Sequence, residues 1–238
     1  TKDQILQNFM KVRKQIEDAE NHSGRPKGSV RLCAVSKFHP QEDVYSAIEG
    51  GQLLFGENRV QEAYGKFPQV VSEFRDVQLH IIGQLQTNKV KKAVEIASCI
   101  QSVDREDLIK EIEKQCAKLH KNIEIYFEIH TGEESKSGYG SREELFATLD
   151  SFMDGKYPHV KPAGLMTMAP FTNDKDLIRK SFSSLRLLKE ELNKKYPSLP
   201  IHELSMGMSG DYEIAIEEGS TMVRVGTALF GERDYGEK

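Results

Sequence analysis

The sequence predicts an α/β fold, a single (β/α)8 or TIM barrel with one extra helix at its N-terminus. From Val30 onward, short apolar runs rich in β-branched residues alternate with amphipathic segments, which is the pattern of βα units and a parallel sheet. About eight such runs occur, and no linker or change of composition divides the 238 residues. Strict alternation over eight strands favours a closed barrel. An open Rossmann-like sheet is the alternative, but its GxGxxG fingerprint is missing.

The extra helix is predicted near the start of the chain. Ile5, Phe9, Val12 and Ile16 recur at helical spacing in a segment that is charged throughout, quite unlike a signal peptide. Such a helix would cover the bottom or the flank of the barrel. No apolar run approaches the ~20 residues of a membrane span, and we therefore expect a soluble, cytoplasmic protein.

The strands are expected at the apolar runs, with a crossover helix after each. In the segment 107–119, for example, Leu108, Ile112, Cys116 and Leu119 form one apolar stripe, while glutamates and lysines face outward. The expected strands are 31–36, 53–55, 79–82, 99–103, 123–129, 163–168, 202–204 and 222–225.

Composition excludes several classes of function. A net charge of −4 with 29% charged residues indicates neither disorder nor a basic nucleic-acid-binding surface. The three cysteines, Cys33, Cys99 and Cys116, are odd in number and lack CxxC spacing, which argues against disulfides and a zinc ribbon. No other metal-ligand spacing occurs, so the cysteines are interpreted as core residues of a reducing compartment.

Lys37 directly follows the first apolar run, and functional groups of barrels come from the carboxyl ends of the strands. There its amine would be partly buried, which lowers its pKa and suits a Schiff-base nucleophile. The alternative is a lysine that only extends to solvent.

Two polar, glycine-rich loops follow the last two expected strands, where barrels commonly bind phosphate. Ser205, Ser209 and Thr227 would donate hydroxyl hydrogen bonds there. The alternative is that Gly207 and Gly226 serve only as turn residues and that Ser209 only caps a helix.

Arg224 lies within the last apolar run, so its guanidinium needs a buried partner. The partner is either a structural carboxylate or a ligand atom beside the phosphate loops. If it were a pyridine nitrogen, the always-charged arginine would donate without transferring a proton, which leaves the ring a poor electron sink. A polar loop at 133–140 is long enough to be a rim or lid element.

Several motifs occur in the order of one known family and cover nearly the whole chain from Lys37 to Arg233. They resemble the pyridoxal phosphate homeostasis protein family, which is related to the N-terminal domain of alanine racemase. The motifs are Val35-Ser36-Lys37, Phe55-Gly56-Glu57-Asn58, His80-Ile81-Ile82-Gly83 with Gln86-Thr87-Asn88-Lys89, Lys136-Ser137-Gly138, Gly164-Leu165-Met166, Leu204-Ser205-Met206-Gly207-Met208-Ser209, and Val223-Arg224-Val225-Gly226-Thr227 with Phe230-Gly231.

The resemblance implies one barrel domain over 1–238, of the fold type III that binds pyridoxal 5′-phosphate (PLP). Lys37 matches the family's Schiff-base lysine, Arg224 would face the pyridine nitrogen and Asn58 would line the pocket. The phosphate would be held by Ser205, Ser209, Gly226 and Thr227, with backbone groups of Met206 and Gly207.

The function implied is PLP binding in intracellular vitamin B6 homeostasis, without catalytic turnover. The expected partners are PLP and possible recipients of it among PLP-dependent apoenzymes. We expect binding neither to nucleic acid nor to a membrane, and we expect a monomer. A racemase-like enzyme is the alternative, but only five residues follow Arg233, too few for the racemases' second domain. A missing second base would have to be sought near Tyr139 or His39. A barrel that binds a sugar phosphate is a third hypothesis, which gives Lys37 no special task unless the protein is an aldolase.

Overall fold

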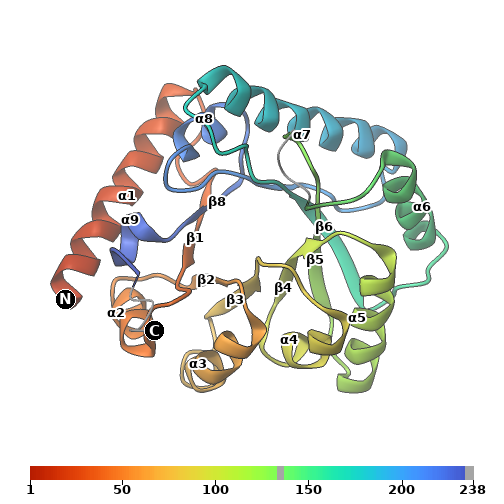
Figure 1. Cartoon of the computed structure of the whole chain (residues 1–238), viewed down its shortest axis with the longest axis horizontal. Helices are drawn as coiled ribbons and strands as arrows, with labels where there is room; N and C mark the ends of the chain where they lie inside the picture. Colours follow the sequence, from red (N-terminus) through yellow and green to blue (C-terminus); the bar gives the residue numbers. More distant parts are fainter. Residues whose placement is uncertain (133–136, 234–238) are drawn as a thin grey trace.

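The computed structural model describes residues 1–132 and 137–233 and confirms the predicted closed barrel (Figure 1). Its parallel strands follow one another in sequence order, and β1 pairs with both β2 and β8, which closes the sheet. All eight predicted strands are present. They are β1 (Arg31–Val35), β2 (Leu54–Glu57), β3 (Gln78–Ile81), β4 (Cys99–Val103), β5 (Ile123–Glu128), β6 (Val160–Met166), β7 (Glu203–Ser205) and β8 (Met222–Val225).

Helices surround the strands on all sides in Figure 1. Within the described part of the chain, none of them is long and apolar enough to cross a membrane. They are α1 (Lys2–His22), α2 (Gln41–Glu49), α3 (Val60–Glu73), the 3-10 helix η1 (Thr87–Lys89), α4 (Val90–Ile96), α5 (Glu106–Leu119), α6 (Arg142–Met153), α7 (Lys175–Lys195), α8 (Tyr212–Glu217) and α9 (Thr227–Phe230).

Helix α5 shows how far the apolar stripe of a helix predicts its burial. Leu108, Ile112 and Cys116 are fully buried as expected, but Leu119 is 41% exposed. Leu119 is the last residue of the helix, and His120 then turns the chain away with a left-handed φ of 50°. The stripe therefore loses contact with the sheet in its last turn.

The predicted N-terminal helix exists and lies on the flank of the barrel, against α2, α8 and α9 (Figure 1). Its four predicted apolar residues are all buried. The Phe9 ring packs edge-on against Phe230, with 5.7 Å between the ring centroids. Helix α1 thus supports α9, which begins at Thr227.

Alternate strand residues point to different cores. The larger core lies between the strands and the helices. The side chains of a smaller cluster, which includes Cys33, Cys99 and Tyr126, point towards the barrel axis. All three cysteines are buried and free, as predicted. Burial raises the pKa of Cys33 to about 12, so its thiol stays protonated.

Candidate functional site

A cavity of about 520 Å³ opens at the carboxyl ends of the strands, where the functional residues of barrels lie. We call it the mouth cavity. It brings together residues that are far apart in sequence, such as Lys37 and Arg233, which are separated by 196 positions. The predicted site residues on its wall are Lys37, Asn58, Ser209, Arg224, Gly226 and Thr227.

Lys37 lies in a turn directly after β1 and is half-buried. Burial lowers the pKa of its amine, and the positive charge of Arg233 lowers it further. The carboxylates of Glu57 and Glu62 oppose this shift. The direction agrees with the prediction and increases the fraction of neutral, nucleophilic amine at neutral pH.

Arg224 is 3% exposed and projects from β8 to the cavity wall. Its guanidinium donates to Ser205 Oγ at 2.7 Å and to the Thr167 carbonyl at 2.9 Å. It makes no ion pair with any residue that the structure describes, so a structural carboxylate is not its partner there. Burial lowers the pKa of Arg224, and the nearby groups Cys33, Asp211 and Glu128 oppose that shift.

Ser205 is placed differently from the expectation. It is fully buried below Arg224, off the cavity wall, and its Oγ accepts from Arg224 and donates to Gln101 Oε1 at 2.5 Å. Gln101 Nε2 is in turn 2.8 Å from His80 Nδ1. Burial lowers the pKa of His80 to about 3, so the ring is neutral and Nδ1 accepts this hydrogen bond. Ser205 therefore orients Arg224.

Met206 and Gly207 also lie behind the cavity wall. The Met206 N–H donates to the Met222 carbonyl at 3.0 Å, so it is used by the sheet, contrary to the expectation that it serves a ligand. Gly207 has φ +107°, and a Cβ there would lie 2.8 Å from Cβ of Ala215. This turn therefore requires a glycine.

The remaining predicted hydroxyls do border the cavity. Ser209 and Thr227 are both exposed to it, and Thr227 is the first residue of α9. Ser209 does not cap α8, because the residue at that N-cap is Asp211. Gly226 directly precedes Thr227 and lies against β1, where a Cβ would approach the Val35 carbonyl oxygen to 3.1 Å. These groups can surround an anion closely.

Glu128 is a cavity residue that the sequence did not single out. It is the last residue of β5 and only 3% exposed, and its Oε2 has no hydrogen-bond partner among the described atoms. Burial raises its pKa to about 7; Asp104 adds to the shift and Arg224 opposes it. The sequence does contain a signal for this position. Glu128 follows Tyr126 by two residues, so both side chains lie on the same, inward side of β5.

Tyr139 and His39, where a second base was expected, are not on the cavity wall. The Tyr139 hydroxyl donates to Thr148 Oγ1 at 3.2 Å, and the His39 ring packs against Phe230. In the loop expected at 133–140, residues 133–136 lie outside the described part of the structure, and Ser137 borders the cavity.

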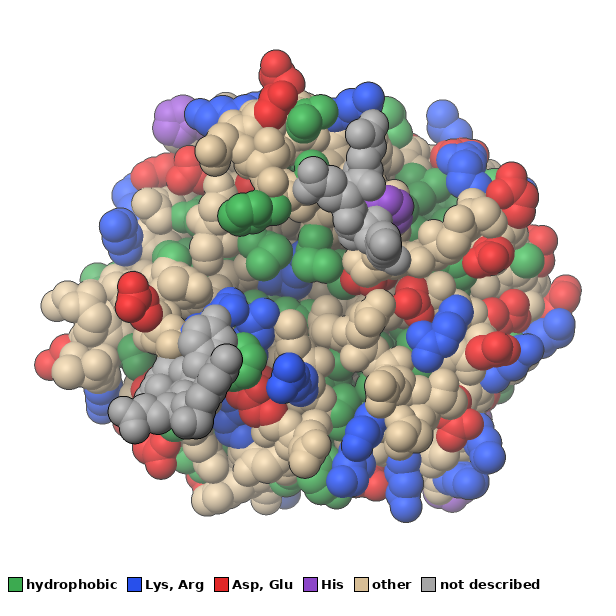
Figure 2. Space-filling view, viewed as in Figure 1, with side chains coloured by type: hydrophobic (Ala, Val, Ile, Leu, Met, Phe, Trp, Pro, Cys, Tyr) green, Lys and Arg blue, Asp and Glu red, His purple; other side chains and the backbone are tan. Residues whose placement is uncertain are grey.

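The rim of the cavity is partly apolar. Met168, Phe171 and Met208 border it and are exposed, Phe171 completely. In the view of Figure 2, hydrophobic and basic side chains meet near the centre of the face, and charged side chains of both signs surround them.

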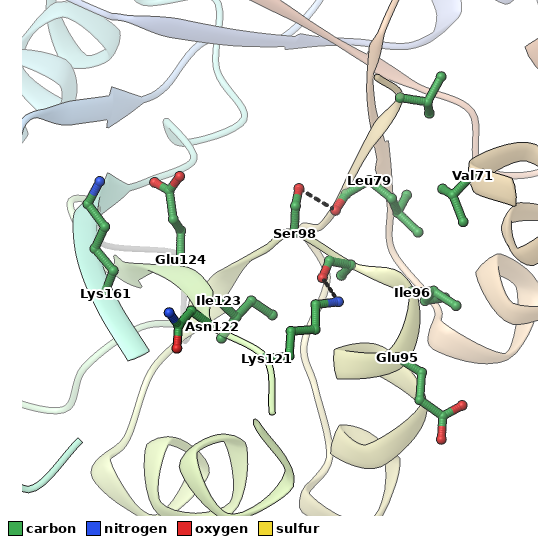
Figure 3. A pocket seen from close by; sticks show the side chains of 12 residues that line it. Val71, Leu79, Glu95, Ile96, Ser98, Lys121, Asn122, Ile123, Glu124 and Lys161 are labelled. Carbon is green, nitrogen blue, oxygen red and sulfur yellow. Dashed lines mark hydrogen bonds between the residues drawn. The ribbon is translucent and has the colours of Figure 1, made fainter. Parts of the chain in front are cut away.

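Another cavity, of about 480 Å³, lies at the opposite end of the barrel and contains none of the predicted site residues (Figure 3). Its Lys121 amine already donates to the carbonyls of Val94 and Ala97, at 2.5 and 2.8 Å. Among the described residues, no group of three or more His, Cys, Asp or Glu side chains could hold a metal ion. The mouth cavity, at the carboxyl ends of the strands, is the candidate site because it contains Lys37, Arg224 and the other predicted residues.

Comparisons with known proteins agree on one family. A model of the alanine racemase N-terminal domain matches residues 8–234. The pyridoxal phosphate homeostasis protein of Aquifex aeolicus is 38% identical over 225 residues, which cover 94% of this chain and 96% of that protein.

Solved structures show the same relation. PipY of Synechococcus elongatus, with PLP bound, has a TM-score of 0.84 at 35% identity over 96% of this chain and 100% of that one. An alanine racemase of Clostridium difficile has a TM-score of 0.72 at 14% identity, and the match spans 56% of that longer chain. At that identity the racemase shares the fold alone.

Proposed function

Since the chain belongs to the pyridoxal phosphate homeostasis protein family, we propose that it binds PLP in the mouth cavity and serves in intracellular PLP homeostasis. One observation carries the proposal: a single cavity contains a lysine of lowered pKa, a buried arginine that forms no ion pair with the described residues, and two loops that present glycines and hydroxyls. An aldehyde, a ring nitrogen and a phosphate are the groups that these residues suit.

The residues fit the cofactor by their chemistry. Ser209, Gly226 and Thr227 would hold the phosphate, and Asn58 would line the pocket beside the ring. Ser205 and Gly207 would act behind this wall, by orienting Arg224 and shaping the loop. The unpartnered Glu128 Oε2 offers a ligand one further acceptor.

Lys37 would hold the cofactor as a Schiff base. The neutral Nζ of Lys37 is the group that would condense with the aldehyde, with a C=N bond in place of C=O and the release of one water. The lowered pKa of Lys37 favours this step, because only the unprotonated amine can attack. PLP when bound supplies an electrophilic aldehyde and a conjugated ring.

We infer a carrier function in place of catalysis. Arg224 stays charged, so it would donate a hydrogen bond to the ring nitrogen without transferring a proton. The ring is then a weak electron sink, which disfavours carbanion chemistry. The protein would act as a cytoplasmic monomer, and apoenzymes that require PLP would be its recipients. A racemase-like activity is the second candidate, which Glu128 on the cavity wall favours.

The test is spectroscopic. Purified protein supplied with PLP should show a visible absorbance band, and borohydride should fix one PLP to the chain at Lys37. Lys37→Ala should lose both the band and the labelling, while its far-UV circular dichroism stays unchanged. Reductive labelling of Lys37→Ala at one specific site would contradict the assignment.

A further inference from the structure

The turn that carries Lys37 is packed against a buried ionic cluster. The turn runs from Ser36 to His39 and is closed by a hydrogen bond of 3.1 Å from the His39 N–H to the Ser36 carbonyl. Phe38 within it has φ +65°, a left-handed conformation that a side chain with Cβ disfavours. A turn of this kind persists only when its surroundings hold it.

Lys66 of α3 holds both ends of this turn. Its side chain is only 7% exposed, and Nζ donates to the carbonyl of Ser36 at 2.8 Å and to that of His39 at 2.9 Å. These two carbonyls flank Lys37 in the chain. One buried ammonium group therefore fixes the path of the backbone on either side of the candidate nucleophile.

Two carboxylates complete the cluster. Glu57 Oε1 accepts from Ser36 Oγ and lies near Lys66 Nζ, each at 2.6 Å. Glu62 Oε1 accepts from the Phe38 N–H at 2.6 Å and lies 3.3 Å from Lys66 Nζ. Ser36, Phe38 and His39 are thus each hydrogen-bonded to this cluster through a side-chain or backbone atom.

The cluster is costly to build for packing alone. Burying a cation and a fully buried carboxylate requires desolvation, and an apolar pair of similar volume often packs as well. Glu57 Oε2 even has no hydrogen-bond partner among the residues that the structure describes. What the cluster supplies that apolar side chains would not supply is direction, because it binds specific backbone atoms next to Lys37.

We propose that Lys66, together with Glu57 and Glu62, is a positioning residue for the Lys37 amine. This inference rests on the proposed function, in which Lys37 Nζ attacks the PLP aldehyde. Lys66 does not touch the cofactor in this proposal; it holds the turn so that Lys37 extends into the cavity.

The cluster also balances charge around Lys37. Glu57 and Glu62 raise the pKa of Lys37, while burial and Arg233 lower it. The cation of Lys66 lies directly on both carboxylates and offsets their field. Burial raises the pKa of Glu57, and loss of this cation should raise it further. The carboxylate of Glu62 would lose the cation that offsets its field, so that Lys37 stays protonated to higher pH.

The experiment compares Lys66→Met and Lys66→Arg in the full-length protein with PLP as the probe. Lys66→Met should form the lysine-bound absorbance band at least about tenfold more slowly at neutral pH, and the pH midpoint of that band should rise by about one unit. Lys66→Arg keeps the charge and donors and should recover most of the rate.

Lys121→Met is the matched control. Lys121 is also partly buried and also donates to two backbone carbonyls, but at the far end of the barrel (Figure 3). It should lower the melting temperature without changing the rate or the pH midpoint of the band. An equal change in both lysine variants would overturn the positioning role.

Glu62→Gln keeps the proposal testable if Lys66→Met does not fold. The amide oxygen can still accept from Phe38, but one charge that raises the pKa of Lys37 is removed. The pH midpoint should therefore fall, and an unchanged midpoint would contradict the proposal. If the wild-type protein forms no lysine-bound band, the proposed function itself is wrong; a normal wild-type band with unaffected Lys66→Met kinetics refutes the positioning alone.

Discussion

Two hydroxyls that look equivalent in the sequence have different surroundings. Thr227 is exposed at the mouth cavity, whereas Ser205 is buried and bonded to Arg224 and Gln101. The direction of a side chain at a strand end depends on its register with neighbouring strands, which the local sequence does not reveal. Substitution of each should therefore affect different parts of the ligand.

We expect Thr227→Ala to weaken PLP binding roughly 10- to 100-fold, because hydrogen bonds to charged groups contribute about 1.5–3 kcal/mol. Binding of unphosphorylated pyridoxal should hardly change. Ser205→Ala should weaken both ligands alike, since it loosens Arg224. Equilibrium titrations of both ligands with each variant measure this, and a loss in Ser205→Ala confined to PLP would show that Ser205 contacts the phosphate.

Glu128 should make the stability of the ligand-free protein depend on pH. Burial raises its pKa from 4.5 to about 7, so the folded state binds its proton more tightly than the unfolded state. This contribution is fully present below about pH 4.5 and is lost as the pH rises through 7. Glu128→Gln should gain on the order of 1–3 kcal/mol of unfolding free energy relative to wild type across that window.

Urea unfolding between pH 4.5 and 8 would measure this difference. Glu124→Gln, a substitution of an exposed residue on the same strand, is the control. Its unfolding free energy should depend on pH in the same way as that of the wild type. Parallel curves for Glu128→Gln would show that the carboxyl does not carry the pH dependence.

Among the structural elements, the loops after β2 and β3 meet closely at the cavity. A Cβ at Gly83 would lie 2.5 Å from the Asn58 carbonyl oxygen and 2.8 Å from its Cα. Backbone cannot yield as a flexible side chain can, so only glycine fits. The resemblance motifs contain both residues, but their contact depends on the pairing of β2 with β3.

Gly83→Ala should therefore displace Asn58, destabilise the protein by about 1–3 kcal/mol and reduce PLP affinity. Gly65→Ala is the control, because a Cβ there meets nothing within 4 Å inside helix α3. It should stabilise the protein by about 0.5–1 kcal/mol and leave binding unchanged. Thermal unfolding and PLP titration separate the two, and tight binding by Gly83→Ala would disprove the contact.

At the scale of the whole molecule, the barrel is shared with alanine racemase, whose chain is considerably longer than the matched part. Among the described residues on the cavity wall, Lys37, Glu128 and Asp211 are the groups that could accept a proton from a substrate. Catalytic turnover would also require an electron sink in the PLP ring. Arg224 does not readily give up a proton, so it would not protonate the ring nitrogen.

We expect no racemisation of L-alanine or L-serine in deuterated buffer above the rate of free PLP. The physical reason is the weak electron sink that a charged arginine would leave at the ring nitrogen. Chiral chromatography with mass detection of deuterium measures both interconversion and exchange. Enzymatic rates that disappear in both Lys37→Ala and Glu128→Gln would favour the racemase alternative and identify Glu128 as the second base.

The sequence by itself determined the barrel and the position of Lys37. The alternation of strand-like and helix-like hydrophobic patterns is a local signal. Eight such strand–helix units in succession allow few folds that bury every strand. The predicted residues Asn58, Ser209, Arg224, Gly226 and Thr227 also line the cavity, but tertiary structure alone decided which residues support them. Ser205 reaches Gln101 across 104 positions, and Lys66 reaches Ser36 across 30. Such contacts arise from strand register and helix docking, so no local pattern could show that Ser205 supports Arg224 or that Lys66 holds the turn with Lys37.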